Sequence, residues 1–160
     1  MKPLIPNIVP KTILNKAYGG ANYTITGDTI SHLLTTFLVP GSSLGPNGSL
    51  EVLVDFSTTT NNANTKTVYL RYANAINMYL AGLANWSGLR ANAMMRNLND
   101  ETKQLVMYNG STGLSVHPNI TYGNIDSRQD QLVYVFGTLA VATDNLTLEG
   151  ITARIWPGVG

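Results

Sequence analysis

The sequence predicts an all-β protein, a two-sheet, jelly-roll-like β-sandwich with an extended, proline-rich N-terminal arm. Much of the chain consists of short segments in which apolar and polar residues alternate, which is the pattern of half-buried strands. Clusters of Gly, Pro, Asn and Asp separate these segments, and no segment of the chain has a convincing helical pattern. Prolines recur every three or four residues at the start of the chain, which favours an extended arm.

The composition fits one domain whose surface is mostly neutral. The 160 residues are 44% hydrophobic, enough for a sizeable core, and only 12% charged, about half the usual share. Such a surface, rich in Asn, Thr, Ser and Gly, is more typical of extracellular β proteins and virus shells than of cytosolic enzymes. With a net charge of +1, the chain lacks the clustered positive charge that nucleic-acid binding needs. No apolar run is long enough to span a membrane. The absence of cysteine excludes disulfides, thiolate zinc sites and a cysteine nucleophile.

The arm is predicted to comprise residues 1–20, and the sandwich domain residues 21–160. A Gly-Gly pair at 19–20 is the expected hinge. An extended arm cannot bury its apolar side chains on itself, so they require another surface. That surface is either the edge of the arm's own domain or a neighbouring subunit or larger shell, and the sequence leaves both open. The candidate contact residues of the arm are Leu4, Ile5, Ile8, Val9, Ile13 and Leu14.

In the first half of the domain, a short alternating segment at residues 23–27 and a longer strand at residues 30–40 are expected. A turn follows at residues 41–48, where Pro fixes φ and the Asn-Gly pair tolerates positive φ. Residues 49–57 alternate cleanly, and residues 66–73 repeat the pattern after a polar loop. These last two strands are predicted to form an antiparallel hairpin.

The second half has one ambiguous element and one long polar segment. Residues 88–99 contain Ala, Met, Arg and Leu, which favour helix, but their alternation predicts a strand. Residues 109–130 are the expected binding loop or variable excursion. A turn at residues 143–145 is predicted to join the two closing strands. The remaining strands are expected at residues 76–82, 103–109, 131–142 and 146–156.

The sequence predicts no metal ion and no cofactor. His32 lies within an expected strand and His117 in the long polar segment, and neither has carboxylates at a ligand spacing. Asp126 and Asp130 offer oxygens for calcium, but the segment between them lacks the oxygen density and glycine of a calcium loop.

The sequence also predicts no catalytic residue and therefore no enzyme. Glu51 and Asp55 face the same side of one strand about 13 Å apart, too far for a glycosidase pair. No nucleophile elbow and no phosphate-binding glycine loop is present. Three aromatic residues are candidates for receptor or glycan contact, although half-buried sheet positions suit them as well. They are Trp86, Tyr108 and Tyr122.

Two segments carry a resemblance to known proteins. The first is "VPGSSLGPNGSLEVLVDFSTTTNNANTKTVYLRYA", from residue 39 to 73, and the second is "QLVYVFGTLAVATDNLTLEGITARIW", from residue 131 to 156. Together they resemble a module of tailed-bacteriophage virion proteins. In that module a Gly-Pro-Asn-Gly turn leads into an alternating strand and an Asn/Thr-rich loop, and a hairpin with an Asp-containing turn closes the domain.

The resemblance implies a jelly-roll virion component synthesised in the host cytoplasm. The short chain has no coiled-coil shaft, which favours a capsid decoration (cement) protein over a fibre. Such a protein binds the major capsid protein on the outer capsid surface, through its arm and as a homotrimer. The alternative is a head-fibre or tail-fibre module that contacts host surface glycans.

Overall fold

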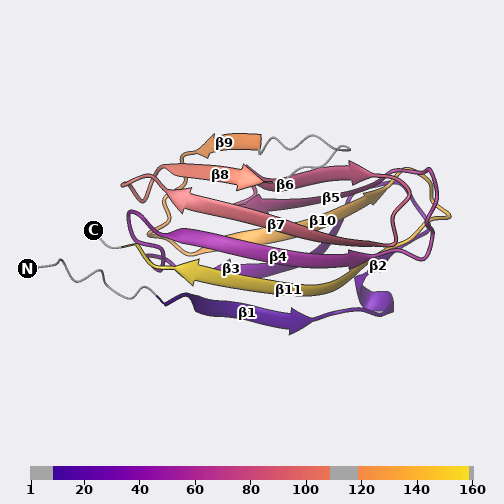
Figure 1. Ribbon diagram of the computed structural model, residues 1–160, viewed down its shortest axis with the longest axis horizontal. Coiled ribbons are helices and arrows are strands. Elements are labelled where there is room, and N and C mark those ends of the chain that lie inside the picture. Colours follow the sequence, from indigo (N-terminus) through magenta and orange to yellow (C-terminus); the bar gives the residue numbers. More distant parts are fainter. Residues whose placement is uncertain (1–8, 109–118, 159–160) are drawn as a thin grey trace, which may run out of the picture.

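The chain forms two antiparallel β-sheets packed face to face, which confirms the predicted fold class (Figure 1). The computed structural model describes residues 9–108 and 119–158. Within these ranges the one helical element is a short 3₁₀ turn, η1 (Ala21–Tyr23). None of the described residues belongs to a helix with the length and apolar character needed to cross a membrane.

The larger sheet lies at the front of Figure 1 and the smaller sheet behind it. In the larger sheet the strands follow the order β1 (Lys11–Ala17), β11 (Leu146–Trp156), β4 (Ser49–Ser57), β7 (Gly88–Asn97), β8 (Gln104–Tyr108) and β9 (Asn119–Gly123), with β2 (Thr24–Ile25) pairing β11. In the smaller sheet the order is β3 (His32–Val39), β10 (Gln131–Leu139), β5 (Lys66–Tyr72) and β6 (Ile76–Leu83).

Both hairpins predicted from the sequence are wrong. β4 and β5 lie in different sheets, and so do β10 and β11, so each connection crosses between the layers. An alternating pattern shows that one face of a strand is buried, but not which of two sheets contains the strand. A true hairpin joins β5 to β6, where Ala73 and Asn74 both adopt φ of 52° in the tight turn.

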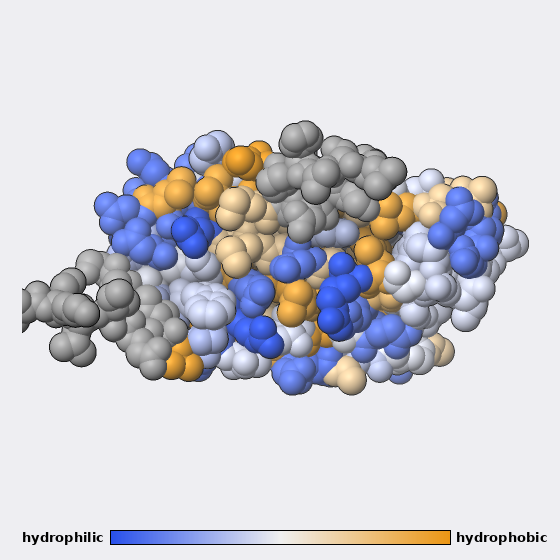
Figure 2. Space-filling model, viewed as in Figure 1, coloured by the Kyte–Doolittle hydropathy of each residue, from blue (hydrophilic) through white to orange (hydrophobic). Residues whose placement is uncertain are grey.

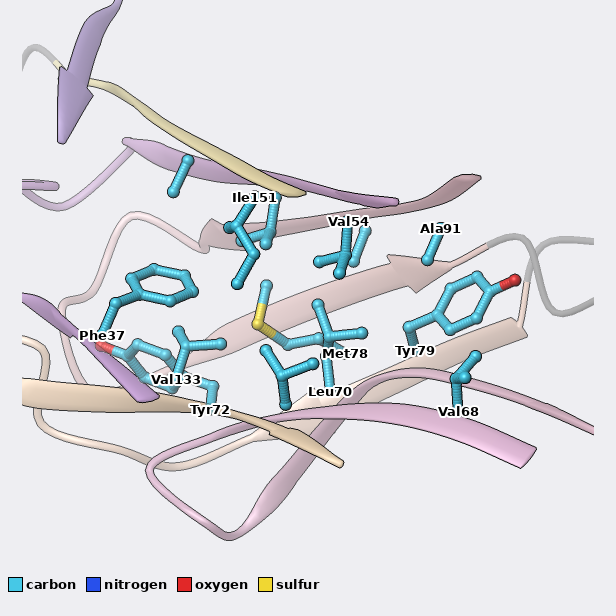
Figure 3. Packing of buried hydrophobic residues seen from close by; sticks show 14 of the residues in the cluster. Phe37, Val54, Val68, Leu70, Tyr72, Met78, Tyr79, Ala91, Val133 and Ile151 are labelled. Atoms are coloured by element: carbon cyan, nitrogen blue, oxygen red, sulfur yellow. The ribbon is translucent and has the colours of Figure 1, made fainter. Parts of the chain in front are cut away.

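The inward faces of the two sheets make one core (Figure 3). Val54, Ala91 and Ile151 of the larger sheet face Leu70 and Val133 of the smaller one, and all five are buried. The alternation predicted for β4, β5 and β7 is confirmed, and β7 is a strand rather than a helix. Burial of these apolar faces provides the main driving force for the fold.

In four places the register between described strands shifts by one residue. Each shift lets two neighbouring residues face the same side of the sheet, as a β-bulge does. In β6, for example, both Met78 and Tyr79 are buried. The extra residues at the four shifts are Ile13, Leu34, Met78 and Glu149.

The second half of the predicted arm is the edge strand of the larger sheet. β1 pairs with β11 from Lys11 opposite Ile155 to Ala17 opposite Gly150. The bulge in β1 lets the adjacent Ile13 and Leu14 both pack against the core. For residues 11–17, the surface that covers the apolar side chains is therefore their own domain.

The other predicted contact residues of the arm lie before β1. Val9 is 68% exposed and is the first described residue. Leu4, Ile5 and Ile8 lie outside the described residues. A predicted arm that is separate from the sandwich is therefore limited to residues 1–10, and Ile13 and Leu14 stabilise the sandwich itself.

A buried ion pair ties together two of the loops that cross between the sheets. Lys66 is fully buried, and its Nζ lies 3.4 Å from Asp144 Oδ2. The ammonium also donates to Asn62 Oδ1 at 3.1 Å and to the Asn64 carbonyl at 3.3 Å. Asn62 in turn donates to Asp144 Oδ1 at 2.8 Å. The Asn/Thr-rich loop of residues 39–73 and the Asp-containing turn of residues 131–156 therefore meet in this Lys66 cluster (Asn62, Asn64, Lys66 and Asp144).

Candidate binding surfaces

The acidic residues considered for chemistry are engaged in local contacts. Within the described ranges, no group of three or more His, Cys, Asp or Glu residues could hold a metal ion. His32 lies at the start of β3, with its Nε2 2.7 Å from Asp28 Oδ1, and this hydrogen bond is the main cause of the lowered pKa of Asp28. Glu51 and Asp55 each contact an arginine of a neighbouring strand, at 3.5 and 2.6 Å. His117 lies outside the described residues.

The two aspartates considered for calcium stabilise local backbone and side chains. Asp126 binds the Arg128 guanidinium through two hydrogen bonds of 2.7 and 3.0 Å, and this contact lowers the pKa of the Asp126 carboxyl. Asp130 Oδ1 accepts a 2.8 Å hydrogen bond from the main-chain N–H of Gly41. The two carboxylates are therefore bound to separate partners.

The outer face of the smaller sheet is rich in apolar and aromatic side chains. These side chains come from all four strands, and the leucines among them are between 38% and 52% exposed. We call this surface the aromatic face; it consists of Leu33, Leu38, Tyr69, Arg71, Leu80, Leu132, Tyr134 and Phe136.

The aromatic rings of this face form an ordered stack. Phe136 lies between Tyr69 and Tyr134, with ring centroids 4.7 and 6.2 Å apart and planes inclined by only 14° in each pair. The Arg71 guanidinium lies 5.2 Å from the Tyr69 ring centre and donates to Asn77 Oδ1 at 3.1 Å. Neighbouring strands and stacked rings therefore hold these side chains in a defined arrangement.

The aromatic face carries very little charge. Arg71 is the one charged side chain at the outward positions of its four strands, all of which are described. Four strands about 4.8 Å apart, with seven residues at about 3.3 Å each, cover roughly 400 Å². This is the area of the whole outer face, which also carries the polar residues Thr36, Thr67, Asn77 and Thr138, so its apolar part is smaller. An apolar patch within this area is of the ordinary size for the largest patch of a monomer, and such patches are often functional.

The outer face of the larger sheet has a different character (Figure 2). Apolar residues gather over β8 and β9 beside Met94 of β7, and polar residues lie over β4, β11 and the rest of β7. Near the end of this face is a hollow of about 340 Å³. Its lining comes from β4, β7, the end of β11 and the turn before β4, and consists of Asn47, Ser49, Met94, Arg96, Trp156, Pro157 and Gly158.

Two glycines hold the backbone at one end of this hollow. A Cβ atom on Gly48 would lie 1.9 Å from the Leu44 carbonyl oxygen, and one on Gly158 would lie 2.2 Å from the Gly48 nitrogen. Gly158 also donates its N–H to the Leu44 carbonyl at 2.7 Å. The positive φ values in this turn belong to Ser42 and Gly45, not to the Asn-Gly pair that the sequence suggested. Gly48 is needed for close backbone contact instead.

The three predicted aromatic contact residues do not form one platform. Trp86 is partly buried and donates its indole N–H to a main-chain carbonyl at 3.1 Å. Tyr122 is 72% exposed on β9 and lies level with Arg96, near the end of β7. Trp86 lies just before the other end of β7, at Gly88, which is about 26 Å from Arg96 along the strand. The side chain of Tyr108 lies outside the description. Sequence reasoning missed Trp156, because a strand-terminal tryptophan gives no sign of the hollow beside it.

Comparison with known proteins gives similarity at the level of fold. No family model matches the chain, and no curated protein matches it. Among solved structures it is similar to a CBM2 module of the evolved Dit protein of Lactobacillus casei BL23 phage J-1, with 12% identity over 78% of this chain and 69% of that chain, at a TM-score of 0.40.

Two further solved structures come from a plant and an animal virus. The Bauhinia forficata lectin, in complex with GalNAc, has 7% identity over 92% of this chain and 98% of that chain, at a TM-score of 0.36. The VP2 subviral particle of infectious bursal disease virus has 11% identity over 96% of this chain and 44% of that chain, at a TM-score of 0.33. Because these sequence identities and TM-scores are low, the function of the chain has to be argued from its own surfaces.

Proposed function

We propose that the chain is a non-enzymatic structural subunit of a phage particle, which binds the outer capsid surface and stabilises the shell. The observation that carries the proposal is the aromatic face, an ordered apolar surface with a single charge. The resemblance of two segments to phage virion proteins supports it. In the structure these two segments meet in the Lys66 cluster, so they act as one structural unit.

The aromatic face suits a protein partner. Its leucines surround stacked rings whose positions are already fixed, so little side-chain entropy is lost on binding. Arg71 rests on its own aromatic neighbours, so its charge is partly balanced before any partner arrives. We assign this face to contact between copies of the chain, in the homotrimer that the resemblance implies.

The arm supplies the second contact, with the major capsid protein. Because the aromatic face is assigned to contact between copies of the chain, contact with the capsid requires a different surface. The exposed Val9 continues the apolar series of Leu4, Ile5 and Ile8 just before the first strand. A ligand that binds only the assembled shell shifts the equilibrium towards assembly, so a bound subunit stabilises the capsid by mass action.

The assembly state and capsid binding can be tested with two substitutions on the aromatic face. Leu38→Asp and Leu80→Asp place charges at half-exposed positions on strands that are not neighbours, so the fold is expected to persist while self-association is lost. Asn92→Asp, on the exposed outer side of β7, is the matched control. Sedimentation velocity is expected to give a trimer for the parent chain and the control, and a monomer for the double variant.

Capsid binding is then measured by adding each protein to purified capsids and recording occupancy and the temperature of capsid disruption. The parent chain is expected to raise that temperature, and the variant lacking residues 1–8 is expected to lose occupancy. A monomeric parent chain, or unchanged occupancy after removal of residues 1–8, would contradict the corresponding half of the proposal.

A second candidate function is a receptor-binding module of a head or tail fibre. The hollow beside Trp156 favours it, because an exposed tryptophan next to an arginine suits recognition of a small polar ligand. Immunogold labelling of purified particles distinguishes the two functions: label over the head supports the decoration role, and label on the tail or on fibres supports the receptor-binding role.

A further inference from the structure

We infer that the hollow beside Trp156 binds a saccharide that carries an anionic group. The hollow opens on the outer face of the larger sheet, away from the aromatic face. The inference therefore does not rest on the proposed role in assembly. It assigns this surface a ligand of defined chemistry.

The wall of the hollow suits the apolar side of a sugar ring. The Trp156 side chain is 38% exposed, and Pro157 and Met94 extend the apolar surface around it. Sugar rings have apolar C–H faces that stack on aromatic side chains, while their hydroxyl groups need hydrogen bonds at the rim. The volume of about 340 Å³ is at the small end of ligand pockets, which suits a mono- or disaccharide.

The polar side of the hollow carries one positive charge. Arg96 Nε donates to Ser49 Oγ at 3.2 Å, which orients the guanidinium. No residue of the described chain forms an ion pair with Arg96, and the lining contains no carboxylate. The acid on the neighbouring part of this face, Glu51, contacts Arg154 at 3.5 Å. A guanidinium held in this way binds a carboxylate or phosphate through two parallel hydrogen bonds.

This combination suits an anionic saccharide better than the other common ligand classes. A purely apolar ligand would take water from the guanidinium N–H groups of Arg96 that are not bound to Ser49, which is costly. A nucleic acid needs several clustered cations, whereas this hollow has one and the whole chain has a net charge of +1. A neutral sugar would use the tryptophan wall but not the charge. An anionic saccharide uses both.

The hollow also lies in line with a further exposed aromatic residue. Trp156 pairs with Ser49, Ser49 with Arg96, and Arg96 with Leu105, so these residues form one row across the sheet. Tyr122 ends the row, opposite Leu105 and about 19 Å from Trp156 at ordinary strand spacing. A longer glycan bound at Trp156 therefore has a second stacking position at the other end of the row.

The binding test uses the full chain and defined methyl glycosides. The chain has two tryptophans, so the Trp86→Phe protein reports on Trp156 alone by fluorescence. It is titrated with the methyl glycosides of glucuronic acid, galacturonic acid and N-acetylneuraminic acid, with methyl glucoside 6-phosphate, and with neutral methyl glucoside and methyl galactoside. At least one anionic sugar is expected to bind ten or more times more tightly than its neutral counterpart.

Three variants assign the binding to the hollow. Arg96→Ala is expected to remove the tenfold preference for the anionic sugar, and Trp156→Ala to weaken binding of every sugar at least tenfold. Since fluorescence is lost with Trp156, these titrations are read by saturation-transfer NMR, and Trp156→Phe is expected to restore part of the affinity. Asn61→Ser, at an exposed loop position beyond the opposite end of β4, is the control and should leave sugar binding unchanged.

Three results would overturn the inference. These are no binding by any anionic sugar, equal binding of anionic and neutral sugars, and binding that survives Trp156→Ala in a protein with an unchanged melting temperature. Loss of trimer formation in the aromatic-face variants with normal sugar binding would show that the two surfaces act separately. Failure of one proposal is therefore distinguishable from failure of the other.

Discussion

At the scale of single residues, the buried charge of Lys66 is stabilised by Asp144. The carboxylate accepts a hydrogen bond from Asn62 and lies within 3.4 Å of the ammonium, and these contacts lower the pKa of Asp144 below its ordinary 3.8. A carboxyl whose pKa is lowered on folding stabilises the fold above its unfolded pKa. This stabilisation is lost as the pH falls from about 4 through the lowered value.

We therefore predict a change in acid sensitivity for Asp144→Asn. At pH 7 the variant is expected to be less stable than the parent, because the Lys66 ammonium stays buried without its counter-ion. As the pH falls from about 4 through the lowered pKa of Asp144, the parent is expected to lose more stability than the variant. Urea unfolding across this pH range measures both effects. Parallel pH profiles for the two proteins would show that Asp144 is not the titrating group.

Individual residues differ in how far the sequence could predict them. The inward positions Val52, Val54 and Leu70 followed from alternation alone, because each strand buries one face. Lys66 did not, because a lysine at the start of a strand is normally exposed, and its buried place depends on an aspartate 78 positions later in the chain. Trp156 was assigned to a strand, but its neighbours in the hollow come from strands whose pairing the sequence did not define.

At the scale of elements, β1 is the part of the N-terminal segment that the sandwich needs for its stability. It pairs with β11 and covers part of the core with Ile13 and Leu14. Without β1, the edge of β11 would expose unpaired backbone groups and the apolar residues beneath it.

This predicts different results for two truncations. Removal of residues 1–8 is expected to leave the melting temperature within about 2 °C of the parent, because the first strand begins at Lys11. Removal of residues 1–17 is expected to lower it by 10 °C or more and to promote aggregation, since a whole edge strand is lost. Differential scanning calorimetry and light scattering measure the two outcomes. Equal stability of both truncated proteins would mean that β1 contributes little to the sandwich.

The bulge in β11 permits an unusual deletion. Leu148 pairs with Phe56 and Gly150 with Asp55, so Glu149 is an extra residue between two regular pairs. Deleting it leaves the facing of residues 151–156 unchanged. Deleting Thr152, three positions later, turns Ala153 and Ile155 outwards and Trp156 inwards.

We predict that the protein without Glu149 folds with a modest loss of stability, whereas the protein without Thr152 does not fold. The chemical shifts of a ¹H–¹⁵N NMR spectrum distinguish the two outcomes, since a folded β-sandwich gives well-dispersed signals. A folded protein without Thr152 would contradict the observed register of β11.

The elements themselves were largely predictable, because alternation is a local property. β7 was correctly distinguished from a helix by its alternating Leu89, Ala91, Ala93 and Met95. β9 was missed within the segment expected to be a loop, since its five residues carry only a short apolar pattern. The pairing of strands was less predictable, because it depends on contacts between residues far apart in the chain.

At the scale of the whole molecule, the chain crosses repeatedly between the two sheets. β3, β4 and β5 lie alternately in the smaller, larger and smaller sheet, and β9, β10 and β11 alternate between the larger and smaller sheets in turn. Neither sheet consists of one continuous piece of chain. The two sheets are therefore expected to unfold together rather than one after the other.

Leu70→Ala tests this cooperativity. Leu70 is fully buried between the sheets, so the substitution is expected to cost about 2–5 kcal/mol of unfolding free energy. Circular dichroism reports on all strands, while Trp86 reports on the connection from β6 to β7, between the two sheets, and Trp156 on the end of β11. Their urea transitions should coincide in both the parent and the variant. Separate transitions would show that part of the sandwich unfolds independently.

The pairing of β1 with β11 also has a mechanical consequence. Because the two strands are antiparallel, Lys11 and Ile155 lie opposite each other at the same end of the sheet. A force that pulls these two residues apart would load the hydrogen bonds between β1 and β11 one after another, so the bonds would break in sequence at low force. A force along the strand direction would instead load many of these hydrogen bonds at once. A subunit that is attached through the broad surfaces of its sheets is therefore expected to withstand shear better than one that is pulled at Lys11 and Ile155.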